Sequence, residues 1–216
     1  MKKAFTLLEL VFVIVVVGIL SAILIPKTET NPVQEAAVQL LSHIRYTQHL
    51  AIVNDKYDAQ DSDWYQRRWQ ILFGKNVDSN SRWAYTIFSD TSGAASGDAN
   101  ELEIAINPAN PNQRMTGGYT GANSLNYNNV GFVGMKKLNL GSSYGITDIT
   151  FSGCGQRIAF DYIGRPMKGD QSTMTGSYHA GSDRLLKADC VITLKHNTDI
   201  ATIKIKPETG YASITF

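Results

Sequence analysis

The chain has almost no excess of charge of either sign. Its 216 residues hold 20 lysines and arginines against 19 aspartates and glutamates, so the formal net charge is +1. Proteins that bind a polyanion such as DNA usually carry a clear basic excess, and none is present here. Any binding of nucleic acid would therefore have to come from a local basic patch.

Catalytic motifs are also lacking. The sequence contains no G-x-S-x-G, H-E-x-x-H or P-loop pattern. Its histidines are scattered, and we expect each to be solvated or hydrogen-bonded: His43, His49, His179 and His196. We therefore expect no enzyme activity, no cofactor and no metal site.

One acidic run leaves a metal alternative open. Asp55, Asp58, Asp61 and Asp63 lie close together, and carboxylate oxygens at such spacing can hold Ca²⁺. The run lacks the glycine and the closing glutamate of an EF-hand loop. A solvated loop at the end of a helix is the expectation.

Long apolar runs are absent except at the start of the chain. Lys2 and Lys3 precede an apolar run over 5–25 that contains one acid, Glu9. About 20 such residues match a ~30 Å hydrocarbon core, and the two lysines favour a cytoplasmic amino end. No A-x-A site follows, so the run is not an ordinary secretory signal. Because a carboxylate at the bilayer centre costs about 2.5–3.5 kcal/mol, Glu9 should have a partner.

The short basic head, Ala4 and the following FTLLE resemble the prepilin leader of type IV pilins and type II secretion pseudopilins. The resemblance implies that a prepilin peptidase cuts between Ala4 and Phe5 and methylates the new amino terminus. Glu9 matches the acid of that family, and Gly18 and Pro26 fall where many pilins carry helix-loosening residues. The family usually has glycine before the cut, where this chain has Ala4.

The same resemblance implies a location and partners. The subunit would cross the bacterial inner membrane once, with its C-terminal domain in the periplasm, and would then join a pilus or pseudopilus. Its partners would be other pilin or pseudopilin subunits, the prepilin peptidase and the inner-membrane assembly platform. In the filament, Glu9 would pair with the amino group of Phe5 on a neighbouring subunit. A plain signal anchor that tethers one exported domain is the alternative.

Cysteine is limited to Cys154 and Cys190, both in the part that would be exported. In an oxidising compartment such a pair is most simply a disulfide. The loop it closes, about 36 residues, is worth roughly 4 kcal/mol in the chain-entropy model. A metal site would need more ligands than two thiols.

Beyond the apolar run, the chain has the pattern of one helix followed by strands. Apolar residues at helical spacing predict an amphipathic helix from Pro32 to about Val53, with Asn31 as N-cap. Later β-type runs predict strands at Arg68–Phe73, Ala84–Ser89, Glu101–Ile106, Asp148–Phe151, Arg157–Tyr162, Asp189–Lys195, Ala201–Lys206 and Ala212–Phe216. We expect an α+β fold, in which a long N-terminal helix, half membrane-spanning and half amphipathic, packs on an antiparallel sheet.

The expected organisation has four parts. These are a leader over 1–4, a transmembrane or filament-core helix over 5–25, an amphipathic continuation over 26–56 and a globular β-sheet domain over 57–216. Within the last part, Asn107 to Tyr144 is rich in small and polar residues and is expected to be a long loop. Such a loop is either functional or a variable surface insertion.

The C-terminal half is similar to the sheet of H-type minor pseudopilins and FimT minor pilins. The similarity is carried by Phe160, Gly164 and Pro166 in IAFDYIGRP, and later by the step from Thr209 to Tyr211. It implies a minor pilin or pseudopilin, a structural subunit of a pilus-like or secretion filament.

Basic residues beside aromatic ones favour an alternative function. Arg67 and Arg68 lie among aromatic residues, and Lys136 and Lys137 lie in the long loop. Such interleaving can hold a nucleic-acid backbone and stack its bases. Some FimT-like minor pilins bind DNA through a basic C-terminal region, whereas this chain ends YASITF. The alternative is therefore a DNA-binding minor pilin that acts in DNA uptake.

Overall fold

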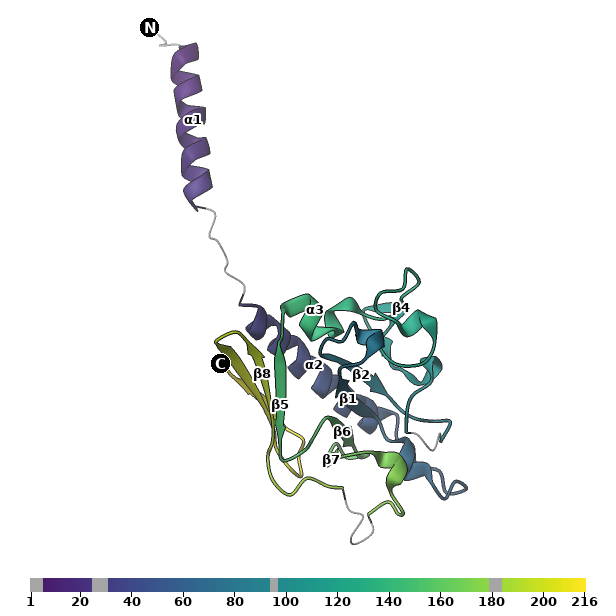
Figure 1. Cartoon of the computed structure of the whole chain (residues 1–216). Coiled ribbons are helices and arrows are strands. Elements are labelled where there is room, and N and C mark those ends of the chain that lie inside the picture. Colours follow the sequence, from purple (N-terminus) through teal and green to yellow (C-terminus); the bar gives the residue numbers. More distant parts are fainter. Residues whose placement is uncertain (1–5, 25–30, 94–96, 179–183) are drawn as a thin grey trace. The chain divides into compact units, whose positions relative to one another are not determined.

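The computed structural model describes residues 6–24, 31–93, 97–178 and 184–216 (Figure 1). The chain forms two compact units, Met1–Asn31 and Pro32–Phe216. The predicted residues Ala4, Phe5 and Pro26 lie outside the described residues.

Helix α1 (Leu7–Leu24) belongs to the first unit. Its sequence is apolar on every side, and its large apolar side chains from Leu7 to Leu20 are exposed. Over the part of the chain that the structure describes, no helix is both long enough and apolar enough to cross a membrane.

Helix α2 (Pro32–Val53) is the central helix of the second unit. Pro32 takes the first helical position, where a backbone N–H has no partner within the helix in any case. Apolar residues then recur every three or four positions, which places them on one buried stripe: Val33, Ala36, Ala37, Leu40, Leu41, Ile44 and Ala51. The helix predicted from the apolar spacing is confirmed with these bounds.

Within the described residues, the strands form three antiparallel sheets. The first sheet has the order β2 (Ala84–Phe88), β1 (Gln70–Gly74), β6 (Arg157–Phe160) and β7 (Pro166–Lys168). The second has the order β10 (Ala212–Thr215), β9 (Asp199–Ile205), β8 (Cys190–His196) and β5 (Asp148–Ser152). The third is a small pair, β3 (Ile106–Asn107) and β4 (Asn110–Arg114).

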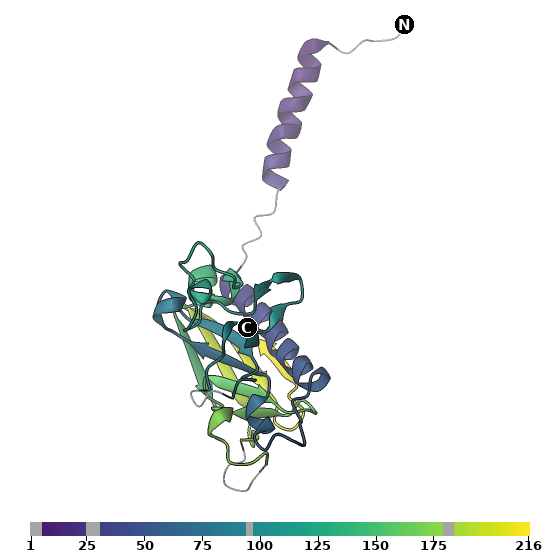
Figure 2. The same cartoon turned by 90° about the vertical axis from the view of Figure 1, so that its right-hand side faces the viewer.

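One apolar core joins α2 to both four-stranded sheets. Leu40 of α2 belongs to the same buried cluster as Phe73 and Ile158 of the first sheet and Ile192 and Ile203 of the second. All of these side chains are at most 1% exposed. Figure 2 shows α2 running alongside the strands, in keeping with its contacts to β1, β6, β8, β9 and β10.

The expected fold, one long N-terminal helix packed on an antiparallel sheet, is wrong. The helical part is divided between α1 and α2, which belong to different units. In the part of the chain that the structure describes, the strands are divided among three small sheets, because β5 pairs with β8 while the next strand, β6, pairs with β1. Strand-by-strand patterns predict which residues are extended, but they contain no information about which strands become neighbours.

The expected loop over Asn107–Tyr144 has structure of its own. It contains β4, the 3₁₀ turns η4 (Asn123–Leu125) and η5 (Lys136–Leu138), and the short helix α3 (Leu140–Tyr144). Leu125, Leu138 and Leu140 are buried, so this segment is anchored to the rest of the unit by apolar contacts.

Candidate functional site

The predicted acid Glu9 lies in the first turn of α1 and is bonded locally. The backbone N–H and the hydroxyl of Thr6 donate to Oε2 of Glu9 at 3.3 and 3.2 Å, and the Glu9 N–H donates to Oγ1 of Thr6 at 3.3 Å. This reciprocal pair is a capping box, which also places the carboxylate at the positive end of the helix dipole. The T-x-x-E spacing in FTLLE is a sequence signal that could have predicted it.

The predicted residue Gly18 lies within α1, and a side chain added there would meet open space. Large apolar side chains surround it along the helix, from Leu7, 82% exposed, to Leu20, 52% exposed. Helix α1 therefore presents an apolar surface that the described residues of its own unit leave uncovered.

The predicted basic residues Arg67 and Arg68 differ in their surroundings. Arg67, at the end of η1 (Trp64–Arg67), forms an ion pair with Asp61 at 2.8 Å. Arg68 is only 4% exposed, and its guanidinium donates to the backbone oxygens of Tyr65 and Ser177. Burial lowers the pKa of Arg68, and the neighbouring Tyr178 and Asp161 oppose that shift. Arg68 is thus a packed internal cation.

The predicted lysines Lys136 and Lys137 are exposed on η5, which lies near the N-terminal end of α2. Lys137 pairs with Glu35 at 3.6 Å, and its backbone oxygen accepts a hydrogen bond from Gln39. The 67–69 segment instead meets the end of α2, where Trp69 donates to Asn54 at 3.1 Å. The distance from Gln39 to Asn54 along a helix is about 20 Å, so the structure does not bring the two basic pairs into one patch.

Cys154 and Cys190 form a disulfide. Cys154 follows β5 and Cys190 begins β8, and these two strands are direct neighbours, with Ser152 opposite Val191. The bond therefore joins adjacent strand ends of the second sheet.

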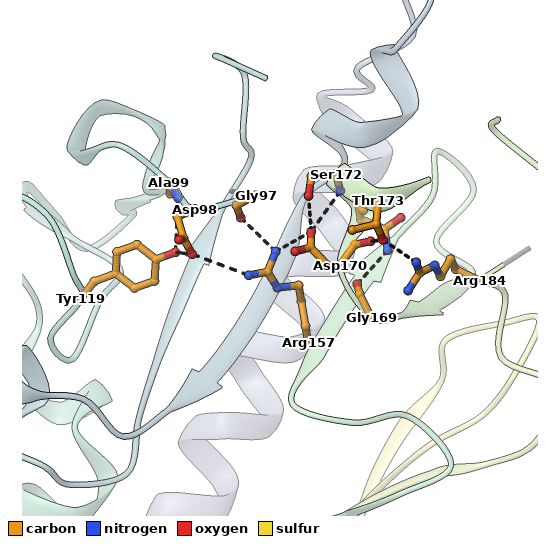
Figure 3. A network of polar contacts seen from close by, with 11 residues as sticks. Gly97, Asp98, Ala99, Tyr119, Arg157, Gly169, Asp170, Ser172, Thr173 and Arg184 are labelled. Carbon is orange, nitrogen blue, oxygen red and sulfur yellow. Dashed lines mark hydrogen bonds and ion pairs between the residues drawn. The ribbon is translucent and has the colours of Figure 1, made fainter. Parts of the chain in front are cut away.

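A polar network surrounds Arg157 of β6 (Figure 3). Its guanidinium meets Asp170 at 2.8 Å and Asp98 at 3.8 Å and donates to the backbone oxygen of Gly97 at 2.9 Å. Asp98 also accepts from the Tyr119 hydroxyl, and Asp170 accepts from the Ser172 hydroxyl. Because these charges are mutually satisfied and Arg157 is mostly buried, the network acts as a cross-link between three segments of the chain.

Sequence reasoning missed an aromatic pocket of about 360 Å³. Its lining comes from segments far apart in the chain: Asp55, Tyr57, Trp64, Tyr162 and Tyr178. We refer to these five residues as the aromatic pocket. The residues 54–64 were read as an acidic loop, and nothing in that loop indicates that residues 162 and 178 lie beside it.

Two rings of the aromatic pocket, Trp64 and Tyr178, are held by charged groups, of which Arg68 and Asp161 are buried. The Arg68 guanidinium lies over Trp64 at 5.2 Å and over Tyr178 at 5.0 Å, and Arg165 lies over Tyr178 at 5.2 Å. Asp161, 1% exposed, accepts hydrogen bonds from Arg165 at 2.7 Å and from the Tyr178 hydroxyl at 3.0 Å. Burial is the main cause of a raised pKa at Tyr178. The Tyr178 hydroxyl therefore keeps its proton, which it shares with the buried Asp161 carboxylate.

No family model, no curated protein and no solved structure matches this chain.

Proposed function

We propose that this chain is a minor pilin or pseudopilin, a structural subunit of a type IV pilus-like or type II secretion filament. The observation that carries the proposal is α1, a helix whose large apolar side chains from Leu7 to Leu20 are exposed. The prepilin-like leader, with Ala4 and Phe5 at the processing site, supports the same class.

The exposed apolar surface of α1 is unfavourable in water, so we expect a partner to cover it. Full burial of one Leu, Val, Ile or Phe side chain contributes about 1.5–3 kcal/mol. A helix that is apolar all round is normally buried on all sides, and a helix left in water would form a large exposed apolar patch. Helices of neighbouring copies of the same kind, packed into a bundle, would cover that surface.

Glu9 would give this packing its register. Both Thr6 groups bond to Oε2, so pairing through Oε1 with the amino group of Phe5 on a neighbouring subunit is compatible with the capping box. A charge pair inside an apolar bundle strongly disfavours misaligned arrangements, because an unpaired buried charge is costly.

The unassembled subunit would be anchored in the bacterial inner membrane by the apolar run over 5–25, which is longer than the described helix α1, with Pro32–Phe216 in the periplasm. Prepilin peptidase would remove residues 1–4, and the inner-membrane assembly platform would take up the mature subunit. Mass spectrometry of the amino terminus tests processing and methylation at Phe5. Extraction of membranes with carbonate tests the anchoring, and release of the full chain by carbonate would contradict it.

The assembly role is tested by Glu9→Gln in the native bacterium. We expect at least a tenfold loss of the protein from sheared filaments, because the amide removes the charge while keeping the shape. Glu35→Gln is the matched control, since Glu35 is an acid in the first turn of α2 that pairs with Lys137 on the surface. Equal filament levels for Glu9→Gln and the wild type would contradict the pairing role.

A further inference from the structure

The aromatic pocket is a candidate ligand site in the second unit, apart from the α1 residues on which the proposed assembly depends. Its volume, about 360 Å³, lies within the usual range of about 300–1,000 Å³ for small-molecule sites. Tyr57 and Tyr162 are 63% and 51% exposed, although each carries a large apolar ring. Large rings grouped around a hollow are more informative than single exposed apolar residues, which are common.

The pocket is organised before any ligand arrives. Arg68 and Arg165 fix Trp64 and Tyr178, and the Tyr57 ring meets the Trp64 ring edge-on at 5.2 Å. The carboxylate of Asp55 accepts the Tyr57 N–H at 3.2 Å, which holds it at the same rim. Binding against Trp64 and Tyr178 therefore loses little of their side-chain entropy.

The surrounding charge disfavours a polyanion. Asp55 lines the pocket, and the connected loop adds Asp58, Asp61 and Asp63, of which Asp61 is paired with Arg67. The cations Arg68 and Arg165 are engaged with the rings and with Asp161. A phosphate backbone in this pocket would therefore lie beside the Asp55 carboxylate, which would repel it.

The same arrangement disfavours a cationic ligand. Aromatic faces attract a cation through their negative quadrupole, but here Trp64 and Tyr178 already hold guanidinium groups. A second cation over these two rings would be repelled by Arg68 and Arg165, and among the described lining residues Asp55 is the one acid that would attract it.

We propose that the aromatic pocket binds a neutral sugar ring. The C–H face of a pyranose is apolar and packs on aromatic rings, while its hydroxyls donate to the Asp55 carboxylate and exchange hydrogen bonds with tyrosine hydroxyls. A neutral sugar therefore packs against the aromatic rings and hydrogen-bonds to Asp55 without bringing a charge into the pocket. This inference goes beyond the filament function and does not depend on it.

The test is to titrate the full chain with neutral hexasaccharides of glucose, mannose and N-acetylglucosamine. Binding is measured by tryptophan fluorescence and by calorimetry. The protein is kept in a detergent without a sugar headgroup, so that the detergent does not compete. We expect saturable binding of at least one probe with a Kd below about 1 mM. Tyr57→Ala and Tyr162→Ala should each weaken it at least tenfold, since both rings are exposed and their loss leaves the core intact.

Tyr211→Ala is the matched control, because Tyr211 is 61% exposed and does not line the pocket. Three outcomes would overturn the proposal: no saturable binding of any of these sugars, binding that Tyr57→Ala and Tyr162→Ala leave unchanged, or saturable binding of tetramethylammonium or oligothymidylate at the pocket in place of sugar. The sugar titration does not require filaments, so it can succeed or fail whether or not Glu9→Gln abolishes them.

Discussion

At the scale of single residues, burial decides what the charged and polar side chains do. His43 of α2 illustrates this, because its Nδ1 lies 2.6 Å from the Tyr85 hydroxyl, which also accepts a hydrogen bond from Gln39 at 3.1 Å. Burial raises the pKa of Tyr85, so the hydroxyl keeps its proton and donates a hydrogen bond to Nδ1 of the neutral His43 ring. A protonated His43 would lose that acceptor.

The pKa of His43 gives a prediction about pH. Burial lowers it from 6.5 to about 4, so between these values the unfolded chain binds more protons than the folded one. The free energy of unfolding should therefore fall as the pH drops below about 6.5, by on the order of 1–2 kcal/mol from this group at about pH 5 after allowance for solvent screening.

Urea unfolding at several pH values measures this effect. His43→Gln should remove part of the slope between about pH 7 and pH 5, and His49→Gln, exposed on the same helix, should keep the wild-type slope. An unchanged slope in His43→Gln would show that other groups are responsible.

At the scale of elements, local chemistry decides where sequence patterns succeed. The β-type run over Glu101–Ile106 predicts a strand, but the structure has the 3₁₀ turn η3 (Glu101–Glu103) followed by β3. The cause is a cap, since the Glu103 carboxylate accepts the Asn100 N–H at 2.7 Å and favours the turn. Strands β4 and β7 were missed because they are short or polar and each contains a proline.

The disulfide between the end of β5 and the start of β8 gives a prediction at the same scale. It closes a loop with a sequence separation of 36, so in the chain-entropy model it stabilises the folded state by about 4 kcal/mol. Replacing both cysteines, Cys154→Ser with Cys190→Ser, should lower the free energy of unfolding by about that amount in urea titrations. A reducing agent should have a similar effect on the wild type and none on the double variant. Wild-type stability that reductant leaves unchanged would contradict the prediction.

At the scale of the whole molecule, the sequence predicted local periodicity but not long-range pairing. The apolar stripe of α2 and most strand positions follow from periods of 3.6 and 2, which are properties of single segments. The fold class was wrong because the pairings of β1 with β6 and of β5 with β8 join distant segments. The aromatic pocket was missed for the same reason, since Tyr57 and Tyr178 come together only in the folded chain.

The shared core of α2 and the two four-stranded sheets predicts that the second unit unfolds as one cooperative system. Leu40 has no exposed surface and belongs to the cluster that both sheets line, so Leu40→Ala should lower the free energy of unfolding by about 2–5 kcal/mol. Hydrogen exchange of the full chain should then show loss of protection by the same amount in β1 and in β9, which belong to different sheets. Val38→Ala is the control on the same helix, because Val38 is 55% exposed and should leave both sheets unchanged. If β1 and β9 lost protection by different amounts, the two sheets would unfold separately, although both pack on α2. That result would contradict the prediction.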